Sequence, residues 1–476
     1  MAFNLKELQN IIDNLITEPW IKREDRNEII DMAGNFAYLI IHENPMRYIH
    51  PEFHNNLYKE VLDMSILQLQ DVYNCNDPCI IDEICELIEE ALRLCFTHIV
   101  PRRSYKNNIA GKPNIGIIAK KIDYLKSVPQ PDQRTNEWYE FRWKYLTASS
   151  IWKAFGTKGA RNQLIYSKCK PLDISKYTGR VNLDSPLHWG QKYEDVSVQW
   201  YEREYKTKVD EFGCIPHKSL QFLAASPDGI NTDPSSDRFG RMVEVKNIVN
   251  RDITGIPKLE YWIQMQIQME VCELNRCDFL ETRFIEYEGF DEFIADGSFS
   301  ISNNLCHKGV MALFFDSDGN PYYEYAPWGL TNETYEKWNE DCMEKNNDKV
   351  WLKNIFWKLD EVSVVVVLRN KLWFDAARPI LQDIWDTIEK ERVSGYQHRA
   401  PNSNKRQKLT HITAPNLSGC IINVTKKDTD NNDNNDNNDI DMDETSNIED
   451  NDKITNHIEP PKITGVNLSL LNTIIN

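Results

Sequence analysis

Two short apolar runs flank a loop rich in Gly, Pro and Ser in the segment 226–246, which reads SPDGINTDPSSDRFGRMVEVK. This pattern predicts a β-hairpin with one strand ending at Asp228 and a second strand at 242–248. Three charged residues, Asp228, Glu244 and Lys246, lie on strands that are otherwise apolar. Because Glu244 and Lys246 are two positions apart, both side chains project from the same face of their strand.

Pairing of the two strands would bring the carboxylate of Asp228 beside that of Glu244. Like charges repel, and burying them is costly unless another group compensates. A divalent cation with oxygen ligands is the natural compensation, which favours Mg²⁺, with Mn²⁺ as a substitute. Lys246 beside the metal can orient a water molecule and stabilise charge on a phosphate. The alternative explanation is a solvent-facing hairpin with a surface salt bridge.

The chain is long enough for two or three domains, and its charge is unevenly distributed. The formal net charge of the 476 residues is −18, but the segment 428–452 alone contains nine Asp and two Glu and no Lys or Arg. Between Lys153 and Arg180, seven basic residues face the single acid Asp173. This basic island is compatible with nucleic-acid contact or with an ordinary solvated surface.

Periodicity and composition divide the chain into four parts. Residues 1–98 predict an all-helical N-terminal domain, whose role the sequence does not reveal. Residues 99–119 are rich in Gly, Pro and basic residues and predict a linker. Residues 120–395 mix helices and strands, with an inserted segment at 291–355. Residues 396–476 form a low-complexity acidic tail that we expect to be disordered.

The cysteine pattern and the short length of the apolar runs indicate the cellular compartment of the protein. The chain has eleven cysteines without a C-x-x-C pair, no signal peptide and no apolar stretch long enough to cross a membrane. We therefore expect an intracellular, cytoplasmic location (host cytoplasm or viral factory for a viral protein) without membrane contact. A metal site could be formed by Cys75, Cys79, Cys85, Cys95 and His98, but the spacings match no usual zinc pattern and favour buried free thiols.

Two predicted helices flank the hairpin. Upstream, LHWGQKYEDVSVQWYEREY carries an apolar stripe, and Glu194 lies beside this stripe, where it could reach the edge of a cleft. Downstream, YWIQMQIQMEVCEL places Gln264 and Gln268 one turn apart. Glutamines in such an apolar helix need hydrogen-bond partners if they are buried, and otherwise face solvent.

Motifs in a specific order extend the pattern. The segments are NEWYEFRWKYLTASSIWKAFG, WGQKYED, AASPDGI, VEVKN and YWIQMQIQME. The P-D…E-x-K pattern is the signature of the PD-(D/E)XK nuclease superfamily, and the order of the segments resembles the lambda-exonuclease-type, YqaJ-like viral recombinase family, including versions in large DNA viruses. The resemblance covers residues 135–290 and weakly 361–393. It implies an α/β (α+β) core with a restriction-endonuclease-like mixed sheet flanked by helices.

The resemblance also implies a role for each matching residue. Asp228 and Glu244 would bind Mg²⁺, and Glu194 would be a further acid near the metal. Lys246 would assist the nucleophilic water, and Gln264 would complete the catalytic set. The family positions that hold a terminal 5′-phosphate are matched by Arg142, Ser149 and Ser226. The LTASS segment is expected to open a helix, whose free N–H groups favour an anion.

The activity that the resemblance implies is Mg²⁺-dependent hydrolysis of DNA by a 5′→3′ double-strand exonuclease, in recombination or end processing. The implied partners are linear duplex DNA with 5′-phosphate ends and a single-strand-annealing or helicase protein, and such exonucleases can be homo-oligomers that encircle DNA. The alternatives are a structure-selective endonuclease, a CRISPR-type adaptation nuclease of the same superfamily, and a DNA-binding scaffold without catalysis. One departure is the separation of 16 positions between Asp228 and Glu244. The extra residues NTDPSSDRF either line the DNA entrance or make a longer turn.

Overall fold

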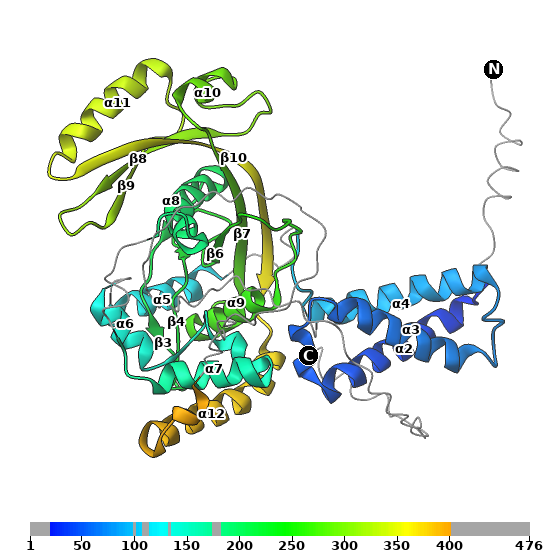
Figure 1. Ribbon diagram of the computed structural model, residues 1–476. Coiled ribbons are helices and arrows are strands. Elements are labelled where there is room, and N and C mark those ends of the chain that lie inside the picture. Colours follow the sequence, from blue (N-terminus) through cyan, green and yellow to red (C-terminus); the bar gives the residue numbers. More distant parts are fainter. Residues whose placement is uncertain (1–19, 99–100, 107–113, 132–134, 174–181, 401–476) are drawn as a thin grey trace, which may run out of the picture. The chain divides into compact units, whose positions relative to one another are not determined.

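The computed structural model describes residues 20–98, 101–106, 114–131, 135–173 and 182–400. This part of the chain is a mixed α/β protein with a helical N-terminal region (Figure 1), which confirms the predicted fold class. It contains no helix that is both long and apolar enough to cross a bilayer. Of the tail predicted at 396–476, residues 401–476 lie outside the described residues, and residues 396–400 are described and include the 3₁₀ helix η4 (Gln397–Arg399).

The N-terminal region is helical, as its periodicity predicts. Its apolar stripes meet in a common core, in which Ile41, Leu57 and Ile84 from three successive helices are completely buried. Residues at the predicted linker are in part structured, because Tyr105 forms an antiparallel bridge with Val366 and a helix begins at Ile115. The helices of this half are α2 (Arg23–Glu43), the 3₁₀ helix η1 (Pro45–Ile49), α3 (Phe53–Leu69), α4 (Pro78–His98) and α5 (Ile115–Ser127).

The main sheet has, within the described residues, seven strands in the order β2-β5-β6-β7-β10-β8-β9. Strands β6 and β7 are parallel, and the other neighbouring pairs are antiparallel. The strands are β2 (Val209–Asp210), β5 (Gly229–Asn231), β6 (Met242–Asn247), β7 (Arg276–Glu286), β8 (Lys308–Phe315), β9 (Pro321–Tyr325) and β10 (Val350–Leu368).

Strand β10 connects the centre of the sheet with the predicted insertion. Its second half pairs with β7, and its first half pairs with β8. The predicted hairpin of the insertion is present as β8 and β9, which turn at Gly319 with a φ of +81°. Helices α10 (Phe290–Ala295) and α11 (Asn332–Lys345) pack on the β8 face that carries Ala312 and Phe314.

A second, smaller sheet changes the predicted hairpin. It has three described strands in the order β1-β4-β3, namely β1 (Leu146–Thr147), β4 (Leu223–Ala225) and β3 (Ile215–Pro216). The apolar run before Asp228 is β4 and belongs to this sheet, so the prediction that it pairs with the strand of Glu244 is wrong. Pro227, which has no N–H group for a ladder, separates β4 from β5, and β5 is the actual partner of β6.

Helices cover both faces of the main sheet. Helix α8 (Pro186–Tyr205) packs with Tyr193 and Val196 against Val243 and Val245 of β6. Helix α9 (Leu259–Cys272) packs on the opposite face, and α12 (Lys371–Ser394) packs on α9, where Trp373 contacts Trp262. The remaining described helices are α6 (Asn136–Trp143), the 3₁₀ helix η2 (Ile151–Phe155), α7 (Lys158–Cys169) and the 3₁₀ helix η4 (Gln397–Arg399). Helix α6 contacts β1, and α7 contacts η2 and η4.

Candidate active site

Asp228 and Glu244 meet at the start of the β5–β6 hairpin. Gly229 is paired with Val243, so Asp228, which precedes it, is level with Glu244 on the neighbouring strand. The Asp228 carboxylate accepts a hydrogen bond from the backbone N–H of Val245 at 2.8 Å. Glu244 is completely buried, and burial together with the charge of Asp228 raises its pKa to about 7. The structure therefore brings together the two carboxylates on which the predicted metal site depends.

Lys246 lies on the same strand face as Glu244 and donates a hydrogen bond to it. Burial opposes the positive charge, but the negative charges of Glu244 and Asp228 raise the pKa of Lys246 above its ordinary value. The side chain is thus an ammonium group fixed beside two carboxylates. Its Nζ also lies 5.3 Å from the ring centre of Tyr261 on α9.

The chemistry of the two carboxylates fits a divalent cation. Both are hard oxygen donors, and the raised pKa of Glu244 shows that its negative charge is poorly compensated in the free protein. In the described part of the chain, no group of three or more His, Cys, Asp or Glu side chains could hold a metal ion. Water or substrate oxygens would therefore complete the coordination, as is usual for Mg²⁺.

Glu194 is less closely connected to this pair. It lies on α8, which covers the face of β6 opposite to the face of Glu244. On the helix it shares one side with Gly190 and Ser197, both of which are hydrogen-bonded to Asn247 at the end of β6. Glu194 is therefore near the end of the strand that carries Lys246. Its role as a further metal ligand stays a prediction.

A different glutamine from the predicted one contacts Glu244. Gln268 is completely buried and donates from Nε2 to Glu244 Oε2 at 2.7 Å and to the Ser226 carbonyl at 3.2 Å. Gln264, one turn earlier, is partly exposed, and no hydrogen bond among the described residues joins it to the acids. The available signal was the four-residue spacing of the two glutamines, which does not tell which one points at the sheet.

Of the residues matched to phosphate binding, Arg142 and Ser149 contact each other, and Ser226 is linked to Glu244 through Gln268. Arg142 donates from Nη2 to Ser149 Oγ at 2.9 Å. Ser149 lies in the turn that follows β1, and Ser226 follows β4, the strand that pairs with β1. The Ser226 hydroxyl oxygen is buried without a hydrogen-bond partner, while the Ser226 carbonyl accepts from Gln268. A buried hydroxyl without a hydrogen-bond partner suits a ligand that accepts a hydrogen bond, as a phosphate oxygen does.

The prediction that the LTASS segment opens a helix with free N–H groups needs correction. The segment forms β1 and a turn, and the helix that follows is the 3₁₀ helix η2 with five residues. A helix this short has only a small dipole, so it adds little to anion binding. The positive charge at the predicted phosphate-binding residues comes from the side chain of Arg142 instead.

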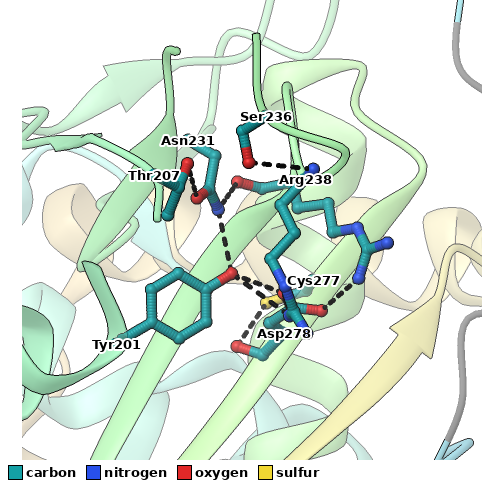
Figure 2. A network of polar contacts seen from close by, with 8 residues as sticks. Tyr201, Thr207, Asn231, Ser236, Arg238, Cys277 and Asp278 are labelled. Carbon is teal, nitrogen blue, oxygen red and sulfur yellow. Dashed lines mark hydrogen bonds and ion pairs between the residues drawn. The ribbon is translucent and has the colours of Figure 1, made fainter. Parts of the chain in front are cut away.

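The extra residues between β5 and β6 are anchored in the protein interior by a network of polar contacts (Figure 2). Arg238 forms an ion pair with Asp278 of β7 and lies 3.3 Å from the ring centre of Tyr205. Arg241 contacts the other oxygen of Asp278 at 3.2 Å, and Tyr201 of α8 donates to the same carboxylate at 2.5 Å.

Asn231 extends this network across the hairpin (Figure 2). Its amide donates to the Tyr201 hydroxyl and to the Arg241 carbonyl, and it accepts from Thr207 at 2.9 Å. Asp278 on β7 is paired with Val243, the residue before Glu244 on β6. The network therefore adjoins the strand that carries Glu244. These polar contacts thus hold the second half of the long β5–β6 connection in the protein interior. The predicted alternative of a DNA-lining loop is not needed to explain its length.

A buried acid that the sequence analysis missed adjoins Lys246. Glu281 of β7 is paired with Lys246 in the parallel register and is 1% exposed. Arg251 forms an ion pair with it at 2.5 Å and lies 5.5 Å from the ring centre of Tyr261. No motif marked this acid, because parallel pairing joins residues that are far apart in the sequence.

A Pro-Asp turn followed by Glu-x-Lys on a central strand of a mixed sheet is the arrangement that defines proteins of the PD-(D/E)XK class. Residues 137–275 match the family model of the YqaJ-like viral recombinase domain, which confirms the resemblance found in the motifs. This match supports a recombination-associated nuclease.

Other proteins resemble the chain more distantly. An uncharacterized protein of Acanthamoeba polyphaga mimivirus, R354, is 29% identical over 331 residues, which cover 61% of this chain and 58% of that protein. Two crystal structures of the alkaline exonuclease LHK-Exo from Laribacter hongkongensis, one in complex with dAMP, are 17% and 18% identical. Each alignment covers 54% of this chain and 94% of the exonuclease, with TM-scores of 0.31 and 0.32.

Proposed function

We propose that the protein is a Mg²⁺-dependent DNA nuclease that degrades linear duplex DNA from 5′-phosphorylated ends. The observation that carries this proposal is the position of Gln268, which is hydrogen-bonded to both Glu244 and the Ser226 carbonyl. One side chain thereby ties the predicted metal-binding acids to the predicted phosphate-binding residues. The match to the YqaJ-like viral recombinase domain supports the same function.

Each residue has a chemical task in this proposal. Asp228 and Glu244 would hold the metal ion, which when bound activates water and withdraws charge from a phosphate oxygen. Lys246, kept positive by the two acids, would hold a water or a phosphate oxygen by donating a hydrogen bond. Arg142, Ser149 and Ser226 would bind the terminal phosphate. Holding the end there would place a neighbouring phosphodiester over the acid pair.

A terminal phosphate carries more charge than an internal diester, so a positive pocket distinguishes a DNA end from the interior of a strand. The expected product is a duplex resected from each 5′ end. We further propose, from the family resemblance, that a single-strand-annealing or helicase protein takes over the exposed strand and that homo-oligomers are formed.

The test uses end-labelled linear duplex with 5′-phosphate or 5′-hydroxyl ends, together with closed circular DNA, with and without Mg²⁺. We expect cleavage only with Mg²⁺, no cutting of the circle, and a rate about tenfold or more higher on phosphorylated ends, which corresponds to about 1.4 kcal/mol. Asp228→Asn should abolish cleavage of every substrate, and Arg142→Ala should reduce the preference but keep slow cleavage.

Other outcomes identify the alternatives. Ready cutting of closed circular DNA would show an endonuclease. Binding of DNA without any cleavage, under all metal conditions, would show a scaffold.

A further inference from the structure

A buried lysine contacts one of the proposed phosphate-binding residues, and the function proposed above gives it no role. Lys168 of α7 belongs to the basic island of the sequence, and its side chain is buried. Its Nζ donates to the backbone carbonyl of Arg142 at 2.8 Å. Within the described residues, no carboxylate forms an ion pair or hydrogen bond with it. A buried ammonium group without an anionic partner is costly, so its presence requires an explanation.

A second cation reinforces the same place. Arg392 of α12 donates from Nε to the Lys168 carbonyl at 2.9 Å and from Nη2 to the Trp143 carbonyl at 3.2 Å. Its guanidinium lies 4.2 Å from the ring centre of Trp143. Lys168 and Arg392 therefore fix the carboxyl end of α6, from which the side chain of Arg142 reaches Ser149.

Burial and charged neighbours make Lys168 titratable near neutral pH. Burial is the largest cause, and together with the positive charges of Arg142 and Arg392, and against an opposite effect of Cys214, it lowers the pKa of Lys168 to about 7. These neighbours come from α6, from α12 and from the loop before β3, and among the described residues they are the charged and titratable groups that act on the pKa of Lys168. Two of these three groups, Arg142 and Arg392, are cations, so the net charge around Lys168 is positive.

We infer that Lys168 is a positioning residue of the 5′-phosphate site, which holds the end of α6 for Arg142 and adds a buried positive charge that a phosphate dianion compensates. This inference rests on the proposed function and adds to it a group that the sequence motifs do not contain. The expected ligand is a terminal phosphate monoester, since its second negative charge satisfies the charge excess that an internal diester leaves.

A purely structural role is the competing explanation, because cations at the carboxyl end of a helix stabilise its free carbonyls. That role would change the stability of the protein but not the ratio of affinities for two DNA ends. The discriminating quantity is therefore the ratio of dissociation constants for 5′-hydroxyl and 5′-phosphate duplexes, measured by fluorescence anisotropy in EDTA.

The variants are Lys168→Met, which keeps the length of the side chain, and Lys170→Met as a matched control. Lys170 is exposed at the end of the same helix, and its recorded contact with Trp143 uses only its backbone carbonyl. We expect the ratio to fall by about tenfold in Lys168→Met and to stay unchanged in Lys170→Met. Lys168→Gln replaces Lys168→Met if the latter does not fold.

The pH dependence gives a second readout. In the full-length wild-type chain the ratio should decrease as pH rises from 6.5 to 8.5, because Lys168 loses its proton, whereas in Lys168→Met it should not decrease. An equal ratio in the wild type and Lys168→Met, or a ratio that does not fall with pH in the wild type, would overturn the inference. Absence of any end preference in a wild type that cleaves DNA would instead contradict the proposed 5′ polarity.

Discussion

Gln268 Nε2 lies 2.7 Å from Glu244 Oε2, and both side chains are completely buried. The bond favours the ionised form of Glu244 and fixes the carboxylate that faces Asp228. We therefore expect Gln268→Ala to lower the cleavage rate about 10- to 100-fold. Gln264→Ala, one turn away, should have a smaller effect, because its side chain does not reach Glu244. Single-turnover cleavage of labelled duplex measures both, and a larger loss for Gln264→Ala would favour the assignment implied by the family.

The acid pair should reduce the stability of the metal-free protein. In Asp228→Asn the carboxamide oxygen can still accept from the Val245 N–H, but the repulsion of Glu244 disappears. We expect a gain of about 1 kcal/mol in the free energy of unfolding in EDTA, together with a loss of cleavage on the order of a thousandfold. Asp237→Asn, an exposed acid in the same hairpin, is the control and should change neither quantity. A destabilised Asp228→Asn would show that the pair is already compensated without metal.

Asp278 should be essential for the stability of the hairpin. Its carboxylate is completely buried and pairs with Arg238 and Arg241, so Asp278→Asn leaves two arginines without their anion. We expect a loss of about 3–5 kcal/mol in the free energy of unfolding, measured with urea. Glu361→Gln removes the acid of the exposed pair with Arg283 and should cost less than about 1 kcal/mol. Similar losses of unfolding free energy in Asp278→Asn and Glu361→Gln would contradict a special contribution of the buried Asp278 network to stability.

Lys168 should make the free energy of unfolding depend on pH in the alkaline range. Its pKa is about 7 in the fold and near its ordinary value, about 10.4, when the chain is unfolded. Between these values the unfolded chain binds one more proton, so this group makes the free energy of unfolding rise as pH increases. The difference between the wild type and Lys168→Met, followed from pH 7 to 10, should therefore change steadily in favour of the wild type. A constant difference would show that Lys168 keeps its ordinary pKa in the fold.

Truncation after Ala400 should leave the nuclease folded and active. The last described residues before this point are held by Arg399, which pairs with Glu391 and donates to Asn162 at 2.8 Å. The Asn- and Asp-rich segment 428–452 has too few apolar residues to form a packed core. Thermal unfolding and Mg²⁺-dependent cleavage of the chain 1–400 measure the effect. Loss of either one would show that the tail is part of the active protein.

The sequence by itself determined the elements and the chemical character of the site. Alternation placed Glu244 and Lys246 on one strand face, and helical periodicity identified the helices that became α8 and α9, because both signals depend only on neighbours along the chain. The Pro-Asp turn and the order of the motifs pointed to the family. These properties are local, so a single sequence contains them.

Only the tertiary structure decided which distant residues became partners. The strand before Asp228 joined a different sheet, Gln268 instead of Gln264 reached the acids, and Asp278 received the arginines of the long hairpin. Lys168 and Arg392, which are 224 positions apart, meet behind Arg142. Such contacts follow from the packing of helices and strands into one core, in which small rotations select the inward residue, and local sequence patterns do not encode this choice.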